Sequence, residues 1–187
     1  AGPEKPNSKR VRKKISLIMD ITINRMQNVK ILRILNCENV QNEPTRCREY
    51  ESGNESRVRV DNNGTTLAYF LPWKRDTGFY IDIPCQNPEA MKFYTPSLTG
   101  CLIGIREIEK NGTLYLRICH WNADGFSEAE LGLYDYWILP KKYEGRVNTI
   151  SANRIAYYSY INSNPAAFYG DFVNNRWEFT LYQTYNG

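Results

Sequence analysis

The sequence predicts a single α/β (α+β) domain in which a mixed β-sandwich core is flanked by helices. Aromatic residues form 13% of the 187 residues, and the 14 tyrosines are typical of half-buried strands. Runs of alternating apolar and polar residues recur, without the repeated strand–helix order of a doubly wound sheet. We therefore expect one domain at residues 15–187, after a flexible basic arm at residues 1–14 whose opening Ala-Gly-Pro is consistent with a cloning-tag remnant.

Periodicity and turn residues predict the elements in order. Strand-like alternation occurs at 16–23, 57–61, 65–73, 79–83, 146–160 and 167–185, the last with a turn at Asn174-Asn175. Residues 24–37 fit either a helix or an extended segment. We expect one or two helical turns at 88–94 and a helix at 127–139, with Ser127 as its N-cap and Pro140 as its stop.

Charge and composition argue against several classes of protein. The net charge is +4, and most of the basic excess lies in the first 14 residues, while acidic and basic residues are interspersed beyond them. A nucleic-acid-binding face needs a basic stripe interleaved with aromatic residues, so we expect no nucleic-acid partner. No apolar run approaches the roughly 20 residues of a membrane helix, and no signal peptide is visible, so we expect no membrane contact.

The cysteine pattern indicates free thiols. The chain has five cysteines, an odd number, and none is paired in Cys-x-x-Cys spacing. This pattern argues against a disulfide framework and against a zinc site. We therefore expect no metal, no cofactor and a reducing compartment. The five are Cys37, Cys47, Cys85, Cys101 and Cys119.

The most readable unit is a hairpin at residues 98–121 that turns at Asn111-Gly112. With a two-residue loop, Ile103 faces His120, and Cys101 precedes Ile103 by two positions on the same face of the strand. Cys101 and His120 are then diagonal neighbours, about 7–8 Å apart at the backbone. The middle of this face is aliphatic, so we expect the pair at the open end of the hairpin near the surface, with a half-solvated opposite face.

A cysteine beside a histidine suits nucleophilic catalysis. The imidazole takes the thiol proton, the sulfur attacks an amide carbonyl, and the protonated ring then gives its proton to the leaving amine. His120 is the only histidine, so any such mechanism must use it. Gly100 permits a turn that points N–H groups at an oxyanion. Thr95, Asn122 and Asp124 are each candidates to orient the ring.

Taken alone, these residues also fit a structural role. A cysteine in a strand is commonly core filler, and a histidine at a strand end is commonly a satisfied polar group. The spacing by itself therefore does not decide between a catalytic pair and ordinary packing.

Several motifs in order resemble one toxin family. Leu98-Thr99-Gly100-Cys101 resembles the Leu-Ser-Gly-Cys motif of that family, and Leu71-Pro72-Trp73-Lys74 and Leu181-Tyr182-Gln183 resemble segments before and after it. Thr95 precedes the cysteine by six residues, as a threonine does there. The chain thus resembles the Burkholderia lethal factor-like glutamine deamidase toxins of the cytotoxic necrotizing factor catalytic-domain superfamily. Thr99 in place of serine and a longer Cys–His stretch depart from the pattern.

The resemblance implies a fold, a reaction and site residues. It implies a β-sandwich core with Cys101 as nucleophile, His120 as base and Thr95 as the group that orients the base, with Leu98, Thr99 and Gly100 forming the substrate and oxyanion region. It implies a secreted virulence toxin, made in the bacterial cytoplasm and delivered to the host cytosol. There it would deamidate a specific glutamine of a host protein, either the translation-initiation RNA helicase, blocking translation, or a small GTPase. We expect a monomer.

Two other readings stay open. The first is a non-catalytic β-sandwich binding module with exposed tyrosines at Tyr157-Tyr158-Ser159-Tyr160 and Tyr169. The second is a transglutaminase or peptidase that uses the same Cys–His pair. We expect substrate recognition at four loops, residues 39–64, 74–97, 122–130 and 161–166. Aromatic candidates for a substrate rim are Trp73, for which simple packing is favoured, Tyr94 and Trp121.

Overall fold

The computed structural model describes residues 18–27, 30–38, 42–75, 77–122, 128–145, 156–161 and 165–185. Of these residues, 61% are in strands and 5% in helices, and the strands form two mixed sheets. The expected β-layered core is confirmed, but the expected flanking helices are not. The helical segments in these ranges are short, namely α2 (Glu128–Leu131), the 3-10 turn η1 (Lys141–Tyr143) and the two residues that follow it, 144 and 145. The predicted arm at residues 1–14 lies outside the described residues.

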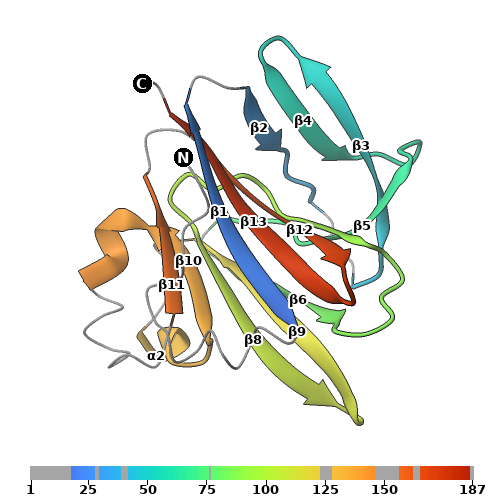
Figure 1. Cartoon of the computed structure of the whole chain (residues 1–187), viewed down its shortest axis with the longest axis vertical. Helices are drawn as coiled ribbons and strands as arrows, with labels where there is room; N and C mark the ends of the chain where they lie inside the picture. The colour runs from blue at the N-terminus through green and yellow to red at the C-terminus, as the bar shows by residue number, and fades with distance from the viewer. Residues whose placement is uncertain are drawn as a thin grey trace.

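The larger sheet has eight strands and curls on itself. β2 pairs with β4 at one edge, yet it also contacts β12 and β13 near the other edge. Figure 1 shows the β3–β4 hairpin at one side of the molecule, beyond β1, β12 and β13. In sheet order the strands are β1 (Met19–Gln27), β13 (Arg176–Tyr185), β12 (Ala166–Val173), β7 (Lys92–Tyr94), β5 (Thr66–Phe70), β3 (Thr45–Ser52), β4 (Glu55–Val60) and β2 (Ile31–Ile34).

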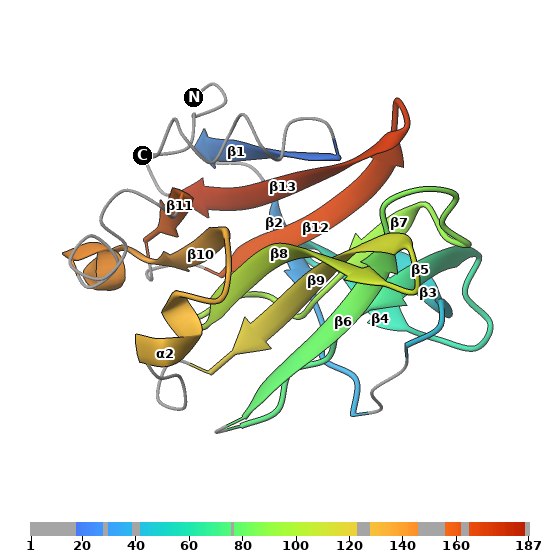
Figure 2. The same ribbon diagram turned by 90° about the horizontal axis from the view of Figure 1, so that it is seen from below.

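The smaller sheet has five strands and packs against the larger one. Its long strands β8, β9 and β6 form one layer, with β12 and β13 of the larger sheet in the other (Figure 2). β10 pairs antiparallel with β8 and parallel with β11. In sheet order the strands are β11 (Ala156–Tyr160), β10 (Tyr136–Pro140), β8 (Leu102–Lys110), β9 (Thr113–Trp121) and β6 (Gly78–Pro84).

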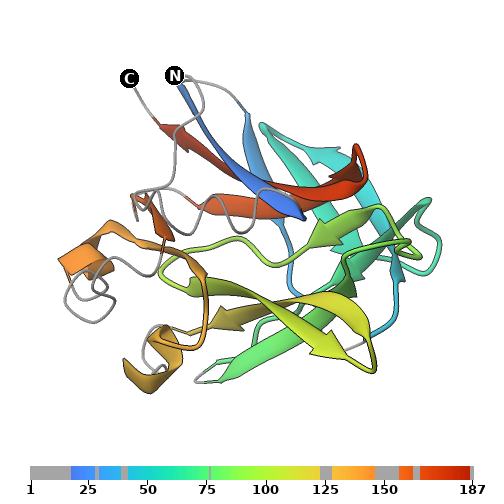
Figure 3. The same cartoon turned by 60° about the horizontal axis from the view of Figure 1, so that its bottom comes forward.

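Three apolar clusters fill the fold. The main core lies between the sheets, where aromatic side chains such as Phe168 and Trp177 meet aliphatic ones such as Ile103 and Ile118. A second cluster, around Trp137, covers the outer face of the smaller sheet. A third lies inside the curl of the larger sheet. Figure 3 shows the β8–β9 hairpin, in yellow-green, at the bottom of the view and the red strands β12 and β13 of the other sheet above it.

Several predicted elements are wrong. Residues 136–140, expected as the end of a helix, form strand β10. All five side chains are buried, and an unbroken apolar run without alternation is typical of a strand that is buried on both faces. The helical turns expected at 88–94 are instead a turn region followed by β7. The polar region before Gly64 contains two paired strands, β3 and β4, where one short strand was expected. Of residues 24–37, which fitted either a helix or an extended segment, 24–27 belong to β1 and 31–34 to β2. The N-cap assigned to Ser127 lies outside the described residues.

Candidate catalytic site

The β8–β9 hairpin has the predicted register. Asn111 and Gly112 have φ angles of 51° and 79°, the left-handed values that a two-residue hairpin loop needs at both positions. Ile103 pairs with His120 as predicted. Cys101 directly precedes β8, whose first residue, Leu102, pairs with Trp121. Cys101 and His120 therefore lie on the same face of the hairpin, and both belong to the side that packs on the main core.

His120 is held by Thr95 in a defined protonation state. Thr95 Oγ1 lies 2.7 Å from His120 Nδ1 and 2.7 Å from the carbonyl oxygen of Leu71. The carbonyl only accepts, so the single hydroxyl proton of Thr95 is donated to Leu71, and Nδ1 must donate its own proton to Thr95. The other ring nitrogen, Nε2, then carries a free lone pair. Of the three orienting candidates Thr95 holds the ring, and Asp124 lies outside the described residues.

Nε2 of His120 has no hydrogen-bond partner among the described residues. The side chain is 1% exposed, so this nitrogen is not satisfied by bulk water either. The pair was expected near the surface, and for His120 that is wrong, because the larger sheet covers this end of the hairpin through Thr95. Buried polar atoms without partners are rare, and they concentrate where chemistry or an absent ligand will use them.

Burial keeps both groups neutral at neutral pH. It lowers the pKa of His120 to about 3, because the charged imidazolium is disfavoured away from water. It raises the pKa of the half-buried Cys101 thiol to about 11, and the nearby Trp73 side chain partly opposes this rise. The resting pair is therefore a thiol and a neutral imidazole, not an ion pair. No hydrogen bond joins them, as is common before a substrate tightens a catalytic site.

The turn that presents Cys101 is fixed by Tyr160. Gly100 has a φ of 131°, in the region that favours glycine. The Gly100 N–H donates to Tyr160 Oη at 2.9 Å, and that hydroxyl donates to the Cys101 carbonyl oxygen at 2.8 Å. The Gly100 N–H is thus already occupied, so an oxyanion would have to be met by other N–H groups of this turn. Leu98 anchors the start of the turn, exchanging backbone hydrogen bonds with Ala166.

Cys101 opens into a pocket of about 270 Å³, here called the Cys101 pocket. Thr99 is exposed at its edge, and Trp73 forms part of its wall. The backbone of Trp73 is clamped by Asn36, whose side-chain amide accepts the Trp73 N–H and donates to the Trp73 carbonyl, both at 2.8 Å. The lining residues are Arg33, Ile34, Leu35, Asn36, Trp73, Pro96, Ser97, Thr99 and Cys101.

The three aromatic residues predicted as candidates for a substrate rim lie in different parts of the structure. Trp73 lines the Cys101 pocket, although packing was favoured for it. Tyr94 is buried and donates its hydroxyl to Glu49 at 2.6 Å, away from Cys101. Trp121 packs with the cluster on the outer face of the smaller sheet. The outer face of the hairpin was expected to be half-solvated. At the open end of the hairpin this face is instead covered by the cluster around Trp137, and Cys119 is buried there.

Sequence reasoning missed two residues of this site, Asn36 and Tyr160. Tyr160 was grouped with exposed tyrosines of a binding surface, yet Tyr158 and Tyr160 are 2% and 0% exposed. Their spacing of two places both on one face of a strand, and this was the available signal. Asn36 lies in a polar segment far from Trp73 in sequence, and no local pattern links them.

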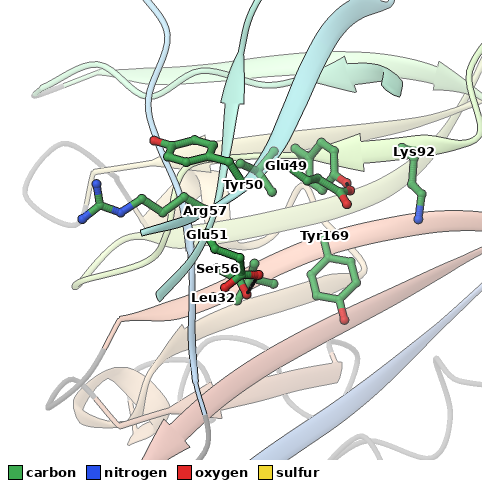
Figure 4. Close-up of a pocket in the computed structure, with 10 residues that line it drawn as sticks. Leu32, Glu49, Tyr50, Glu51, Ser56, Arg57, Lys92 and Tyr169 are labelled. Carbon is green, nitrogen blue, oxygen red and sulfur yellow. Dashed lines mark hydrogen bonds between the residues drawn. The ribbon is translucent and has the colours of Figure 1, made fainter. Parts of the chain in front are cut away.

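A second and larger pocket, of about 450 Å³, lies where β3, β4 and β2 curl towards β7 and β12, and is called the Glu49 pocket. Its charged groups are paired. Glu49 accepts the Tyr94 hydroxyl, Lys92 is paired with Asp171, and Arg57 is paired with Glu55. Figure 4 shows Arg57 extending away from Glu49 and Lys92. The lining residues are Leu32, Glu49, Tyr50, Glu51, Ser56, Arg57, Val58, Lys92, Tyr94 and Tyr169.

The described residues contain no group of three or more His, Cys, Asp or Glu side chains arranged to hold a metal ion. Among their helices, none has the length and apolar character needed to cross a membrane.

No protein-family model matches the chain, and no curated protein matches it. The assignment of chemistry therefore depends on the arrangement around Cys101 and on the motifs given above.

Proposed function

We propose that the chain is a cysteine hydrolase that deamidates a glutamine side chain of a host protein. Cys101 is the nucleophile, His120 is the general base and Thr95 orients the base. One observation carries the proposal. The buried Nε2 of His120 is fixed as a bare acceptor by the Thr95 hydrogen bond, on the same hairpin face as the Cys101 thiol. A bare acceptor on the same face as a thiol, within reach once a substrate is bound, is what general-base activation requires.

The reaction runs through a thioester. The Cys101 thiol gives its proton to His120 Nε2 while its sulfur bonds to the glutamine amide carbon. The imidazolium then protonates the amide nitrogen, the C–N bond breaks, and ammonia leaves. Water gives a proton to Nε2 and its oxygen bonds to the thioester carbon, after which the C–S bond breaks. The protonated ring returns its proton to the sulfur, leaving glutamate and the starting enzyme.

The neutral resting pair suits this sequence. Because burial disfavours the imidazolium, His120 returns its proton readily to the leaving nitrogen. The Nδ1–H bond to Thr95 fixes the ring orientation and stabilises the charge that appears transiently on it. Since Tyr160 occupies the Gly100 N–H, the backbone N–H of Cys101 is the donor that we assign to the oxyanion.

The small pocket favours a side-chain amide over a stretch of main chain. Its volume of about 270 Å³ is below the roughly 300–1,000 Å³ of pockets that enclose drug-sized ligands. A single side chain fits such a space. The choice of glutamine, the action as a bacterial toxin in the host cytosol, and the target, a translation-initiation RNA helicase or a small GTPase, come from the family resemblance.

The test compares three proteins in host-cell lysate, namely wild type, Cys101→Ser and Cys37→Ser. Cys37 is the matched control because, of the other described cysteines, it alone is half-buried and not buried. Mass spectrometry should find Gln-to-Glu conversion with wild type and Cys37→Ser and none with Cys101→Ser. Cross-linked or cleaved products would instead identify a transglutaminase or a peptidase. Conversion that persists in Cys101→Ser would end the proposal.

A further inference from the structure

We propose, resting on the function above, that Trp73 activates Cys101 by donating its indole Nε1–H to the thiolate sulfur. Trp73 is then a positioning residue for the nucleophile and not a packing residue. The inference begins from an anomaly in the wall of the Cys101 pocket. The Trp73 Nε1 atom is buried and has no hydrogen-bond partner among the described residues. An indole nitrogen is only a donor, and burying it without an acceptor costs free energy.

The unpaired N–H lies beside the thiol. Trp73 and Cys101 line the same pocket, and the indole approaches the sulfur closely enough to lower the pKa of Cys101, against the larger opposite effect of burial. The contact falls short of full hydrogen-bond geometry in the resting protein. A thiolate is a much better acceptor than a thiol, because hydrogen bonds to ionised groups are shorter and stronger. The hydrogen bond from the Trp73 Nε1–H to the Cys101 sulfur therefore forms when the thiol loses its proton.

The backbone holds Trp73 in position for this task. Two hydrogen bonds of 2.8 Å from the Asn36 side chain clamp both polar groups of the Trp73 backbone. Two residues earlier, the carbonyl of Leu71 accepts the Thr95 hydroxyl that orients His120. The segment 71–73 thus connects to both members of the pair. It fixes the partner of the base at one end and the donor to the nucleophile at the other.

In the resting protein, no charged group in this wall is available to stabilise the thiolate. His120 is neutral, and a resting imidazolium is disfavoured by burial. The one cation lining the pocket is Arg33, and both nitrogens it directs at Glu55 are engaged, at 2.8 and 3.1 Å. The indole N–H of Trp73 is therefore the donor that offsets desolvation when the thiol proton moves to Nε2. The electron pair of the broken S–H bond stays on sulfur, and the tryptophan loses no proton.

The test is the pH dependence of Cys101 alkylation by iodoacetamide. The rate is followed on the tryptic peptide 93–106 in wild type, Trp73→Phe and Trp121→Phe. Trp121 is the matched control, because its Nε1 is also buried without a hydrogen-bond partner in the described structure, but beside Cys119 on the outer face. We expect Trp73→Phe to move the midpoint to higher pH and slow alkylation at neutral pH about 10-fold or more. Trp121→Phe should keep the wild-type profile.

A second variant guards against simple misfolding. Asn36→Ala removes the backbone clamp and leaves the indole in place, and it should move the alkylation midpoint in the same direction by less. A folded Trp73→Phe with the wild-type profile overturns the inference, as does an equal shift in Trp121→Phe. If Trp73→Phe does not fold, an Asn36→Ala protein with the wild-type profile overturns it. The proposed function fails separately, through deamidation that survives Cys101→Ser.

Discussion

The Glu49 pocket and the Cys101 pocket differ in size and in how their polar groups are satisfied. The Glu49 pocket is larger, about 450 Å³ against about 270 Å³, but its carboxylates and cations are paired with one another or with tyrosine. Around the smaller Cys101 pocket, two buried nitrogens lack partners in the described structure, Trp73 Nε1 and His120 Nε2. None of the four unsatisfied buried side-chain atoms of the described residues lines the Glu49 pocket, so these atoms, and not volume, are our reason for proposing the chemistry at Cys101.

The unpaired nitrogens also have an energetic meaning. Leaving a buried donor or acceptor without a hydrogen bond costs about 1–3 kcal/mol, which is a large fraction of the free energy of unfolding of a small domain. The Glu49 pocket avoids this cost by internal pairing, so its side chains contribute to folding. The Cys101 region bears it, and we interpret the cost as the consequence of keeping an acceptor and a donor free for a substrate. The predictions below separate these two roles.

The largest expected effect is loss of activity in His120→Asn. The asparagine amide can still donate to Thr95 in the place of Nδ1, so the variant removes Nε2 while keeping the bond that holds the site together. General-base catalysis contributes about 10²–10⁴-fold, and we expect deamidation to fall about 10³-fold. The rate of Gln-to-Glu conversion measured by mass spectrometry checks this. Activity within tenfold of wild type would show that His120 is not the base.

Thr95→Val should have the next largest effect on activity. Valine keeps the shape of threonine but cannot accept the Nδ1 proton, so the ring is free to rotate or to move its proton to Nε2. We expect the deamidation rate to fall roughly 10- to 100-fold. Thr66→Val is the control, because Thr66 lies in β5 of the larger sheet and is not a hydrogen-bond partner of His120. Equal losses in both variants would mean that the effect is structural.

The hairpin could be predicted from sequence because its geometry is local. Asn111-Gly112 fixes the loop, the loop fixes the register, and the register places Cys101 and His120 on one face. The contact of His120 with Thr95 is different, because Thr95 follows β7 in the other sheet and no local rule joins the two. The residues alone left Thr95 as one of three candidates, and the family resemblance selected it.

Elements with unusual burial could not be predicted. β10 is buried on both faces and reads as a continuous apolar run, which does not distinguish a strand from a helix. β3 has the opposite difficulty, because Cys47 is its only fully buried side chain and the strand reads as a polar loop. The role proposed for Trp73 depends on a buried indole N–H without an acceptor. This feature is visible only in the folded structure and not in the sequence.

Acid should destabilise the protein through His120. The folded protein holds the pKa of this ring at about 3, while the ordinary value is 6.5. Below pH 6.5 the unfolded chain binds a proton that the folded protein excludes, so stability falls as the pH is lowered towards 3. At about 1.4 kcal/mol per pH unit, the loss by pH 5 is about 2 kcal/mol. Urea denaturation at pH 7 and pH 5 should show this loss in wild type beyond any loss in His120→Asn. Equal losses would contradict the buried, neutral ring.

The smallest effect is expected in the Glu49 pocket, and it should be an effect on stability alone. Tyr94→Phe removes the hydroxyl that donates to Glu49 at 2.6 Å and leaves the ring in its buried position. A hydrogen bond to a charged group contributes about 1.5–3 kcal/mol, and we expect a loss near the lower end, because Glu49 is exposed enough for water to replace the hydroxyl. Urea denaturation measures the loss, and deamidation should stay within about twofold of wild type. A Tyr94→Phe protein with unchanged stability and much reduced deamidation would remove the distinction between the pockets, because the larger one would then belong to the substrate path.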